Sequence, residues 1–180
     1  VFGEPGMSNF YAWLIITLIA TAGCKRTQNF PSLDMNFATP TSVVAHSSGD
    51  YFFVLNSDDN RDFNQGSIIT ISKEGEKVAV IPAQRLGRNF AISGNDLLAI
   101  YAGNEDGVAP KVDLFDAADA KSLKLSRSWE LDDCNPINVV ARANYKYFAV
   151  SCDNGSLYIV EFATPRSDSQ IHLVRRYPCA

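Results

Sequence analysis

Short apolar runs separated by turn residues recur three times along the chain at a constant spacing. In the segment 41–56, an apolar run at 43–45 and a second run at 51–55 enclose a polar turn. The segments 89–104 and 137–154 repeat this arrangement. The three units begin near Pro40, Arg88 and Pro136, which are 48 residues apart. A fixed period of about 20–50 residues predicts a repeat architecture.

Each unit contains four predicted strands bounded by the Gly, Asn, Asp and Pro residues that turns require. After its first two strands, each unit continues with two more, at 67–71 and 77–81, at 111–115 and 123–131, and at 156–162 and 171–177. The second strand of each unit is nearly continuously apolar, which is typical of a strand covered on both faces. The later strands alternate more with polar residues. No segment after residue 24 has the apolar spacing of a helix.

Four-stranded antiparallel units of this length, with the most polar strand last, are typical of β-propeller blades. The sequence therefore predicts an all-β fold, a partial β-propeller of three four-stranded antiparallel blades at 40–87, 88–135 and 136–180, preceded by an N-terminal signal-peptide helix. A β-sandwich also presents many short strands and is the alternative fold. Because closed propellers have about four to eight blades, three units predict the N-terminal part of a longer protein. A fragment without a stable fold of its own is a further hypothesis.

In a propeller, we expect the strands of each blade to run in sequence order from the axis outward. The second strands should then be the most buried. The first and third blades should each expose apolar side chains along one face, because part of the ring is absent and such patches mark a missing partner surface.

One four-residue motif resembles a known family. The sequence FVLN at 53–56 ends the second strand of the first unit, and it resembles the aromatic-Val-x-Asn signature of YVTN-type β-propellers, which are related in form to bacterial surface-layer and lactonase-like propellers. The other two units depart from the signature, with AIYA at 99–102 and AVSC at 149–152. The resemblance covers about 40–177. A lactonase-like member would need acidic or His ligands that converge on the central channel around a bound metal.

The apolar segment 10–23 contains no charged residue and is shorter than the roughly 20 residues that cross a bilayer as a helix. Its length is typical of a signal-peptide h-region. It leads into Thr21-Ala22-Gly23-Cys24, which resembles the lipobox of bacterial lipoproteins, although Thr21 replaces the usual Leu and no basic region precedes it. The resemblance implies a lipidated Cys24, a signal peptide at 1–24 and a tether at 25–39.

Several further expectations accompany this N-terminal segment. Met7 is the expected start, which leaves 1–6 upstream of it. The expected location is the bacterial cell envelope, where the lipid anchors the protein to a membrane. A secretory signal cleaved elsewhere or a short membrane anchor are the alternatives, and Lys25 with Arg26 would hold the end of such an anchor in the cytoplasm.

The remaining cysteines indicate an oxidising compartment. Cys134 and Cys152 lie at the same end of the first hairpin of the third unit, so we predict a disulfide between them. It would close a loop of about 19 residues and contribute about 3 kcal/mol. Two independent buried thiols are the alternative. Cys179 would be unpaired or bonded outside this segment.

The loop after the first YVTN-like motif contains weak binding candidates. Asp58, Asn60 and Asp62 occupy alternate positions, as at the start of a calcium loop. However, Phe63 replaces the expected Gly, and Ile69 stands where a bidentate Glu belongs. A solvated acidic loop is therefore the preferred interpretation, and no metal site is predicted. The weak binding candidates are Asp58, Asp59, Asp62 and His46.

Catalytic chemistry has little support in the sequence. His46 and His172 are the only histidines, and they lack a metal-ligand spacing. His46 ends an inner strand and could face the central channel, but a lone His there is more often structural, and His172 is expected at the surface. The sequence contains no Gly-x-Ser-x-Gly, phosphate-loop or Cys-x-x-Cys motif. We predict neither catalytic residues nor a cofactor.

The charge of the chain excludes one class of partner. The net charge is −4 and the sixteen basic residues are scattered, so a nucleic-acid surface is not expected. The sequence predicts an envelope-anchored lipoprotein whose propeller is a non-enzymatic scaffold, with an unknown protein or small molecule bound at its loops. The alternative is a lactonase-like propeller hydrolase with a metal in the central channel.

Overall fold

The computed structural model describes residues 33–60, 62–63, 65–103, 107–142 and 146–176. These residues form twelve strands in three sheets and one short 3₁₀ turn, η1 (Arg166–Asp168). Blade 1 contains β1 (Pro40–Ala45), β2 (Tyr51–Asn56), β3 (Gly66–Ser72) and β4 (Lys77–Ala83). Blade 2 contains β5 (Gly87–Ser93), β6 (Asp96–Tyr101), β7 (Lys111–Asp116) and β8 (Lys124–Glu130). Blade 3 contains β9 (Pro136–Ala141), β10 (Tyr147–Cys152), β11 (Ser156–Glu161) and β12 (Gln170–Arg176).

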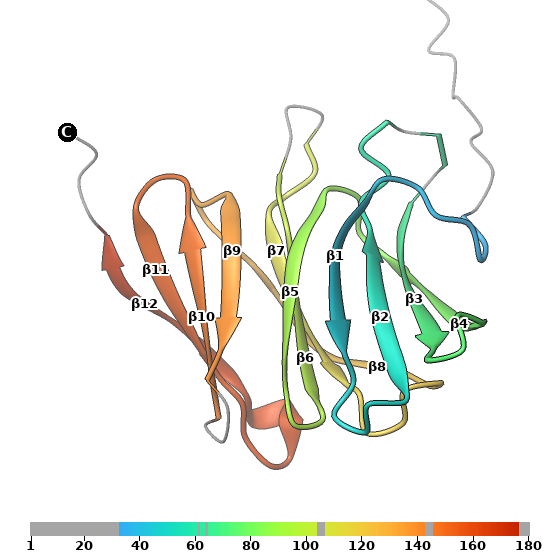
Figure 1. The fold of residues 1–180 in the computed structure, drawn as a ribbon. Helices are drawn as coiled ribbons and strands as arrows, with labels where there is room; N and C mark the ends of the chain where they lie inside the picture. Colours follow the sequence, from blue (N-terminus) through green and yellow to red (C-terminus); the bar gives the residue numbers. More distant parts are fainter. Residues whose placement is uncertain (1–32, 61, 64, 104–106, 143–145, 177–180) are drawn as a thin grey trace, which may run out of the picture.

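The strands of each blade are antiparallel and lie in sequence order. Figure 1 shows the three blades side by side, with β1, β5 and β9 as neighbouring inner strands, and β5 lies against both of the others. The predicted all-β fold of three four-stranded blades is confirmed, and the described strands are not exchanged between sheets as a sandwich would require. The predicted signal-peptide helix lies outside the described residues. Within the described part of the chain, no helix has the length and apolar character to span a membrane.

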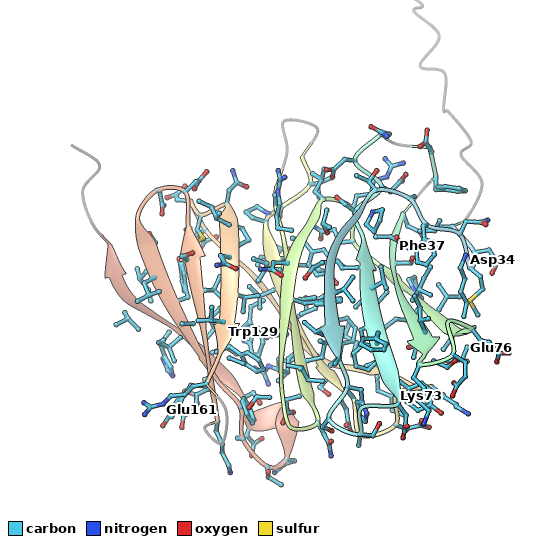
Figure 2. The ribbon with its side chains drawn as sticks, viewed as in Figure 1. Asp34, Phe37, Lys73, Glu76, Trp129 and Glu161 are labelled. Atoms are coloured by element: carbon cyan, nitrogen blue, oxygen red, sulfur yellow. A yellow bond between two sulfur atoms is a disulfide. The ribbon has the colours of Figure 1, made fainter. Side chains whose placement is uncertain are left out.

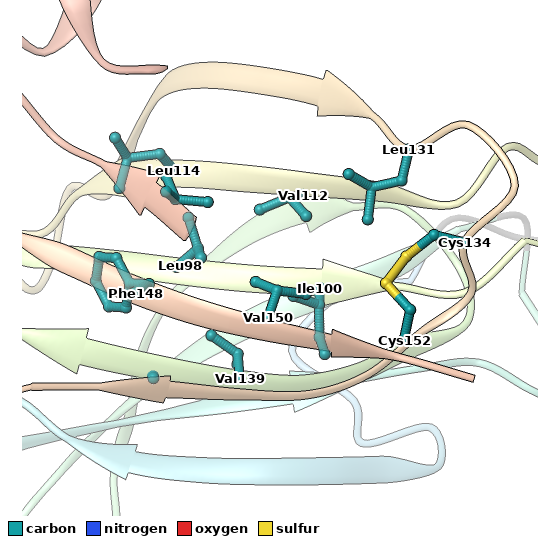
Figure 3. Close-up of a cluster of buried hydrophobic side chains, with 12 residues drawn as sticks. Leu98, Ile100, Val112, Leu114, Leu131, Cys134, Val139, Phe148, Val150 and Cys152 are labelled. Atoms are coloured by element: carbon teal, nitrogen blue, oxygen red, sulfur yellow. A yellow bond between two sulfur atoms is a disulfide. The ribbon is translucent and has the colours of Figure 1, made fainter. Parts of the chain in front are cut away.

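The continuous apolar run of β6 is explained by its place in the middle blade. Leu97 and Tyr101 pack in a cluster with Phe53 of blade 1, whereas Leu98 and Ile100 pack in a second cluster with blade 3. Alternate side chains of a strand point to opposite faces of the sheet. Figure 3 shows Leu98 and Ile100 on the blade 3 side, beside Val139, Phe148 and Val150. Both faces of β6 are therefore covered, and all six of its residues are buried.

Blade 1 differs from the expected burial order, because β3 is buried as fully as β2. Ile68 packs toward blade 2, while Ile69 lies on the opposite face with Val54, and both isoleucines are fully buried. Residues 33–39, assigned to the tether by the sequence, lie against this blade. Ser57 N donates to Thr39 O at 3.0 Å, and the Lys77 ammonium lies 4.2 Å from the ring centroid of Phe37. Figure 2 labels Phe37 at this edge of blade 1.

A chain of polar side chains connects the three inner strands. Ser42 Oγ of β1 donates to Asn89 Oδ1 of β5 at 2.6 Å, and Asn89 Nδ2 donates to Asn138 Oδ1 of β9 at 2.6 Å. We call Ser42, Asn89 and Asn138 the inner polar ladder. Its members occupy equivalent positions of the three repeats. The ladder therefore fixes how each inner strand is positioned along the next.

Between blades 1 and 2, a buried phenol lacks a hydrogen-bond partner. Tyr101 is fully buried, and its hydroxyl has no partner among the described residues. The neighbouring Asp113 carboxylate is bonded instead to Lys111 Nζ at 3.0 Å and to Ser128 Oγ at 2.6 Å. Burial, and secondarily the charge of Asp113, raise the pKa of the Tyr101 phenol well above 10.0. Just above pH 10, the Tyr101 phenol therefore remains protonated in the folded state, whereas the phenol of an unfolded chain would ionise.

We expect Tyr101→Phe to raise the free energy of unfolding by about 1–3 kcal/mol at neutral pH, because it removes a buried hydroxyl without a partner. A raised folded-state pKa contributes stability below the unfolded value near 10 that is lost as the pH rises further. The substitution should therefore also reduce the loss of stability above pH 10. Urea unfolding at several pH values measures both effects. A less stable variant at neutral pH would show that the hydroxyl is hydrogen-bonded in solution.

Candidate functional site

The upper face of the propeller is the end at which the inner strands begin, at the top of Figure 1. There, a pocket of about 790 Å³ lies between the loops of blades 2 and 3 and is lined by Gly103, Pro110, Asp133, Asn135 and Asp153 among others. A second pocket of about 270 Å³ shares three of these residues and extends to the inner strands at Arg88 and Ile137. We call the two together the upper cleft. Loops at one end of a rigid scaffold are frequent positions for binding residues.

Asn135 connects three segments of the upper cleft. Its Oδ1 accepts a hydrogen bond from Gly103 N at 2.9 Å, and its backbone N donates to Asp153 Oδ1 at 3.2 Å. Asp153 N returns a bond to Asn135 O at 3.0 Å. At Gly103, a Cβ atom would lie 2.6 Å from Pro110 Cδ and 2.8 Å from Val108 O. Glycine is therefore required for this close approach.

A disulfide supports the same region from beneath. Cys134 and Cys152 are joined, with 5.5 Å between their Cα atoms, and both are buried. This is the pairing that the sequence predicts. It connects the segment before β9 to the end of β10, directly beside Asn135 and Asp153. Cys24 and Cys179 lie outside the described residues.

The chemistry of the upper cleft is that of a polar binding surface. Asp133 and Asp153 supply exposed carboxylates on one side, and Arg88 supplies an exposed guanidinium at the inner edge. Together with the amide of Asn135, these groups can accept and donate hydrogen bonds to a polar ligand. In the described ranges, no group of three or more His, Cys, Asp or Glu side chains is arranged to hold a metal ion.

The acidic candidates of blade 1 lie in a different loop, and Asp58 is not solvated as expected. Asp58 is fully buried, its Oδ2 accepts a bond from Arg85 Nε at 3.0 Å, and its Oδ1 accepts one from Phe63 N at 3.1 Å. Asp59 and Asp62 are exposed, and Asp59 accepts a hydrogen bond from Ser57 Oγ. The ion pair with Arg85 explains the difference for Asp58, since a buried carboxylate requires a charged partner.

His46 lies at the lower end of the propeller, away from the upper cleft. Its Nδ1 accepts a bond from Ser48 N at 3.2 Å, and its Nε2 donates to Ala117 O of blade 2 at 2.8 Å. The ring also packs edge-on against Phe53, with 5.8 Å between centroids. These contacts join blades 1 and 2 and do not present the imidazole to a ligand. His172 is exposed on the outer strand β12.

Apart from Cys134, which is predicted as a disulfide residue, the residues of the upper cleft are not among the candidates that the sequence indicates. Asp153 precedes Asn154 and Gly155 in a turn between two strands, and nothing in the local sequence of Asn135 indicates a binding residue. The repeat itself could have indicated this site. In every blade, the residues after the second strand and those before the inner strand lie at the same face of the propeller. Asn135 directly precedes β9, and Arg88 is the second residue of β5.

No protein-family model and no curated protein sequence matches this chain. Solved structures share its fold. A putative 6-phosphogluconolactonase from Bacteroides fragilis has a TM-score of 0.59 and 18% identity over 76% of this chain and 38% of its own. A periplasmic gluconolactonase from Pseudomonas aeruginosa has a TM-score of 0.57 and 14% identity over 77% of this chain and 40% of its own. The Cps50 (Swd1) β-propeller domain from Myceliophteria thermophila has a TM-score of 0.54 and 20% identity over 77% of this chain and 43% of its own.

These similarities define the class of fold. The chain is a repeat protein with the architecture of a partial β-propeller, similar to lactonase-like and other propellers. It spans about two fifths of the length of the chains that it matches.

Proposed function

We propose that this chain is an envelope lipoprotein whose propeller binds a protein or a small molecule through the upper cleft, without catalysing a reaction. The observation that carries the proposal is the cleft itself. Asn135 joins its loops, the Cys134–Cys152 disulfide supports its floor, and its exposed groups are Asp133, Asp153 and Arg88. A surface that is held in one conformation before binding loses less entropy on association.

Two features support an extracytoplasmic location. Disulfides persist in oxidising compartments such as the bacterial periplasm, and Cys134 with Cys152 forms one. The segment 10–24 has the length of a signal-peptide h-region, and its ending resembles a lipobox apart from Thr21. A lipid on Cys24 would keep Leu33 within about 30 Å of the membrane, because an extended chain spans at most about 3.3–3.6 Å per residue.

Labelling with palmitate in a diderm bacterium tests the anchor. The wild-type chain should incorporate label and fractionate with membranes, and Cys24→Ala should lose both properties. Cys179→Ala is the matched control and should keep them. Label that persists in Cys24→Ala would contradict the proposed lipidation site.

Site-specific photo-crosslinking in the same cells tests the binding face. A photoreactive residue in place of Arg88 lies in the upper cleft, and one in place of Glu74 lies in the β3–β4 turn at the lower end, near the labelled Lys73 and Glu76 of Figure 2. The proposal predicts discrete adducts at position 88 and none at position 74. Equal labelling at both positions would contradict a specific upper face.

The alternative function is lactone hydrolysis, which is favoured by the likeness to the two gluconolactonase structures. Purified chain should be assayed with gluconolactone and 6-phosphogluconolactone, with and without added divalent metal. Under the binding proposal, the rate equals the spontaneous rate. Hydrolysis that Asp133→Asn or Asp153→Asn abolishes would establish the enzyme and overturn the non-catalytic assignment.

A further inference from the structure

A pocket between blades 1 and 2 has both of its walls within the described residues, unlike the outer faces of blades 1 and 3. Those faces expose apolar side chains, among them Val43 and Val140, as the sequence predicts. The inner strands β1 and β5 lie against each other, and nearer the outer strands the pocket, of about 390 Å³, lies between β4 and the pair β7 and β8. Pockets that bind small molecules have volumes of about 300–1,000 Å³. This pocket shares no lining residue with the upper cleft.

Most of the pocket wall is apolar. Side chains from both blades form it, namely Ile81, Pro82, Ala83, Phe115, Leu123 and Leu125. Phe115 and Leu123 are buried in the cluster between the two blades, whereas Leu125 is 56% exposed. An apolar ligand in the pocket would remove the surface of Leu125 from water, which favours binding.

Two charged side chains of β7 form a polar end of the pocket. Lys111 and Asp113 occupy alternate positions of β7 and therefore lie, with Phe115, on the face toward blade 1. Lys111 Nζ lies 3.0 Å from Asp113 Oδ2, and Asp113 Oδ1 accepts a hydrogen bond from Ser128 Oγ at 2.6 Å. An ammonium has three N–H donors, and each carboxylate oxygen accepts more than one hydrogen bond. Both groups can therefore bind a ligand without breaking their own ion pair.

The buried phenol without a hydrogen-bond partner adjoins this polar end. Tyr101 pairs with Lys111 across β6 and β7, and its ring centroid lies 5.4 Å from Lys111 Nζ. The Tyr101 hydroxyl has no partner among the described residues. This unmade hydrogen bond is a second indication, besides the cavity, that the polar end accommodates a group that the described chain does not supply.

Two hydrogen bonds between the blades hold the pocket walls at a fixed separation. Gln84 Nε2 donates to Ala109 O at 2.9 Å, and Thr70 Oγ1 donates to Ala120 O at 2.9 Å. Ala109 precedes β7 and Ala120 follows it, so the two bonds lie toward opposite ends of this strand. The pocket is therefore formed before a ligand binds, which reduces the entropy lost on association.

We propose that the pocket between blades 1 and 2 binds an uncharged small molecule with an apolar body and one hydroxyl group. The apolar body lies between β4 and Leu125, and the hydroxyl accepts a hydrogen bond from Lys111 Nζ and donates one to the Asp113 carboxylate. The charges of Lys111 and Asp113 compensate each other. A charged ligand group would therefore lose its hydration without gaining a counter-charge. This inference does not depend on the proposed function, because the upper cleft is a separate site.

Methyl NMR titrations of the full chain test the inference with three probes that share one apolar body, namely octanol, octanoate and octylammonium. We expect octanol to shift the methyl resonances of Ile81, Leu123 and Leu125 saturably, and the two charged probes to bind at least about ten-fold more weakly. Leu125→Asp should abolish the binding of octanol, because it places a charge in the apolar wall. Leu173→Asp is the matched control and should bind octanol as the wild type does, since Leu173 is 49% exposed on β12, the outer strand of blade 3.

Asp113→Asn tests the polar end, since it keeps the shape of the side chain and leaves the Lys111 charge uncompensated. Octanoate should then bind more tightly than octanol. Lys111→Met is the second variant, because it leaves the Asp113 charge instead, and it should favour octylammonium.

Three outcomes would overturn the inference. One is the absence of saturable shifts up to the solubility limit of octanol. Another is equal affinity of the wild type for all three probes, or shifts spread evenly over the exposed methyl groups of every blade. The third is octanol binding that Leu125→Asp leaves unchanged.

Discussion

Asp58→Asn should lower the free energy of unfolding by about 3 kcal/mol, because it removes the buried carboxylate charge that pairs with the Arg85 guanidinium. The Asp58 carboxylate is fully buried, and the partnered Arg85 side chain is 21% exposed. Asparagine has nearly the same shape and tolerates the positive φ of 52° at this position. The substitution therefore tests the charge and not the backbone.

Equilibrium urea unfolding provides the measurement. Asp62→Asn is the matched control in the same loop, because Asp62 is exposed, and its effect should stay within about 0.5 kcal/mol. If the two substitutions had equal, small effects, Asp58 would be solvated, as the sequence alone indicates.

Loss of the Cys134–Cys152 disulfide should destabilise the chain by about 2–5 kcal/mol, since the bond constrains the unfolded state across a sequence separation of 18 residues. Cys134→Ala with Cys152→Ala removes it without adding a polar group to the buried site. The upper cleft should also lose its fixed conformation, because Asn135 and Asp153 adjoin the two cysteines. Thermal unfolding of the oxidised wild type and the double variant measures the first effect.

Peptide mapping without reductant tests the pairing itself. The exported protein should yield a single linked peptide that contains Cys134 and Cys152. A Cys24→Ala, Cys179→Ala double variant should retain that peptide and its stability. A peptide that joins Cys152 to Cys179 would contradict the assignment.

The fold was predictable because it is encoded by local, repeated patterns. The period of 48 residues locates the three units, and the apolar run of β6 indicates a strand covered on both faces. The sequence also predicts that the last strand of each blade is the most polar. In blade 2 this strand is β8, and most of its residues are exposed. The burial of β3 was not predictable, because it depends on which segments cover the far side of blade 1.

The candidate site was less predictable because its contacts join residues that are distant in the sequence. Asp58 meets Arg85 across 27 residues, Gly103 meets Asn135 across 32, and His46 meets Ala117 across 71. Nothing in the local sequence of Asp58 distinguishes a buried carboxylate from its exposed neighbour Asp59. The register between blades determines these pairs, and it becomes visible only when the blades are placed beside one another.

The arrangement of the three blades is the claim on which the site and both proposals depend, and methyl NOEs in solution test it most directly. The fold predicts one set of contacts that joins Leu55 and Ile68 to Leu97, and a second set that joins Ile100 and Leu114 to Val139 and Val150. It predicts no contact between the first blade's Leu55 and the third blade's Val150. Direct NOEs between those two residues would show that blades 1 and 3 face each other as a sandwich, and would contradict the propeller.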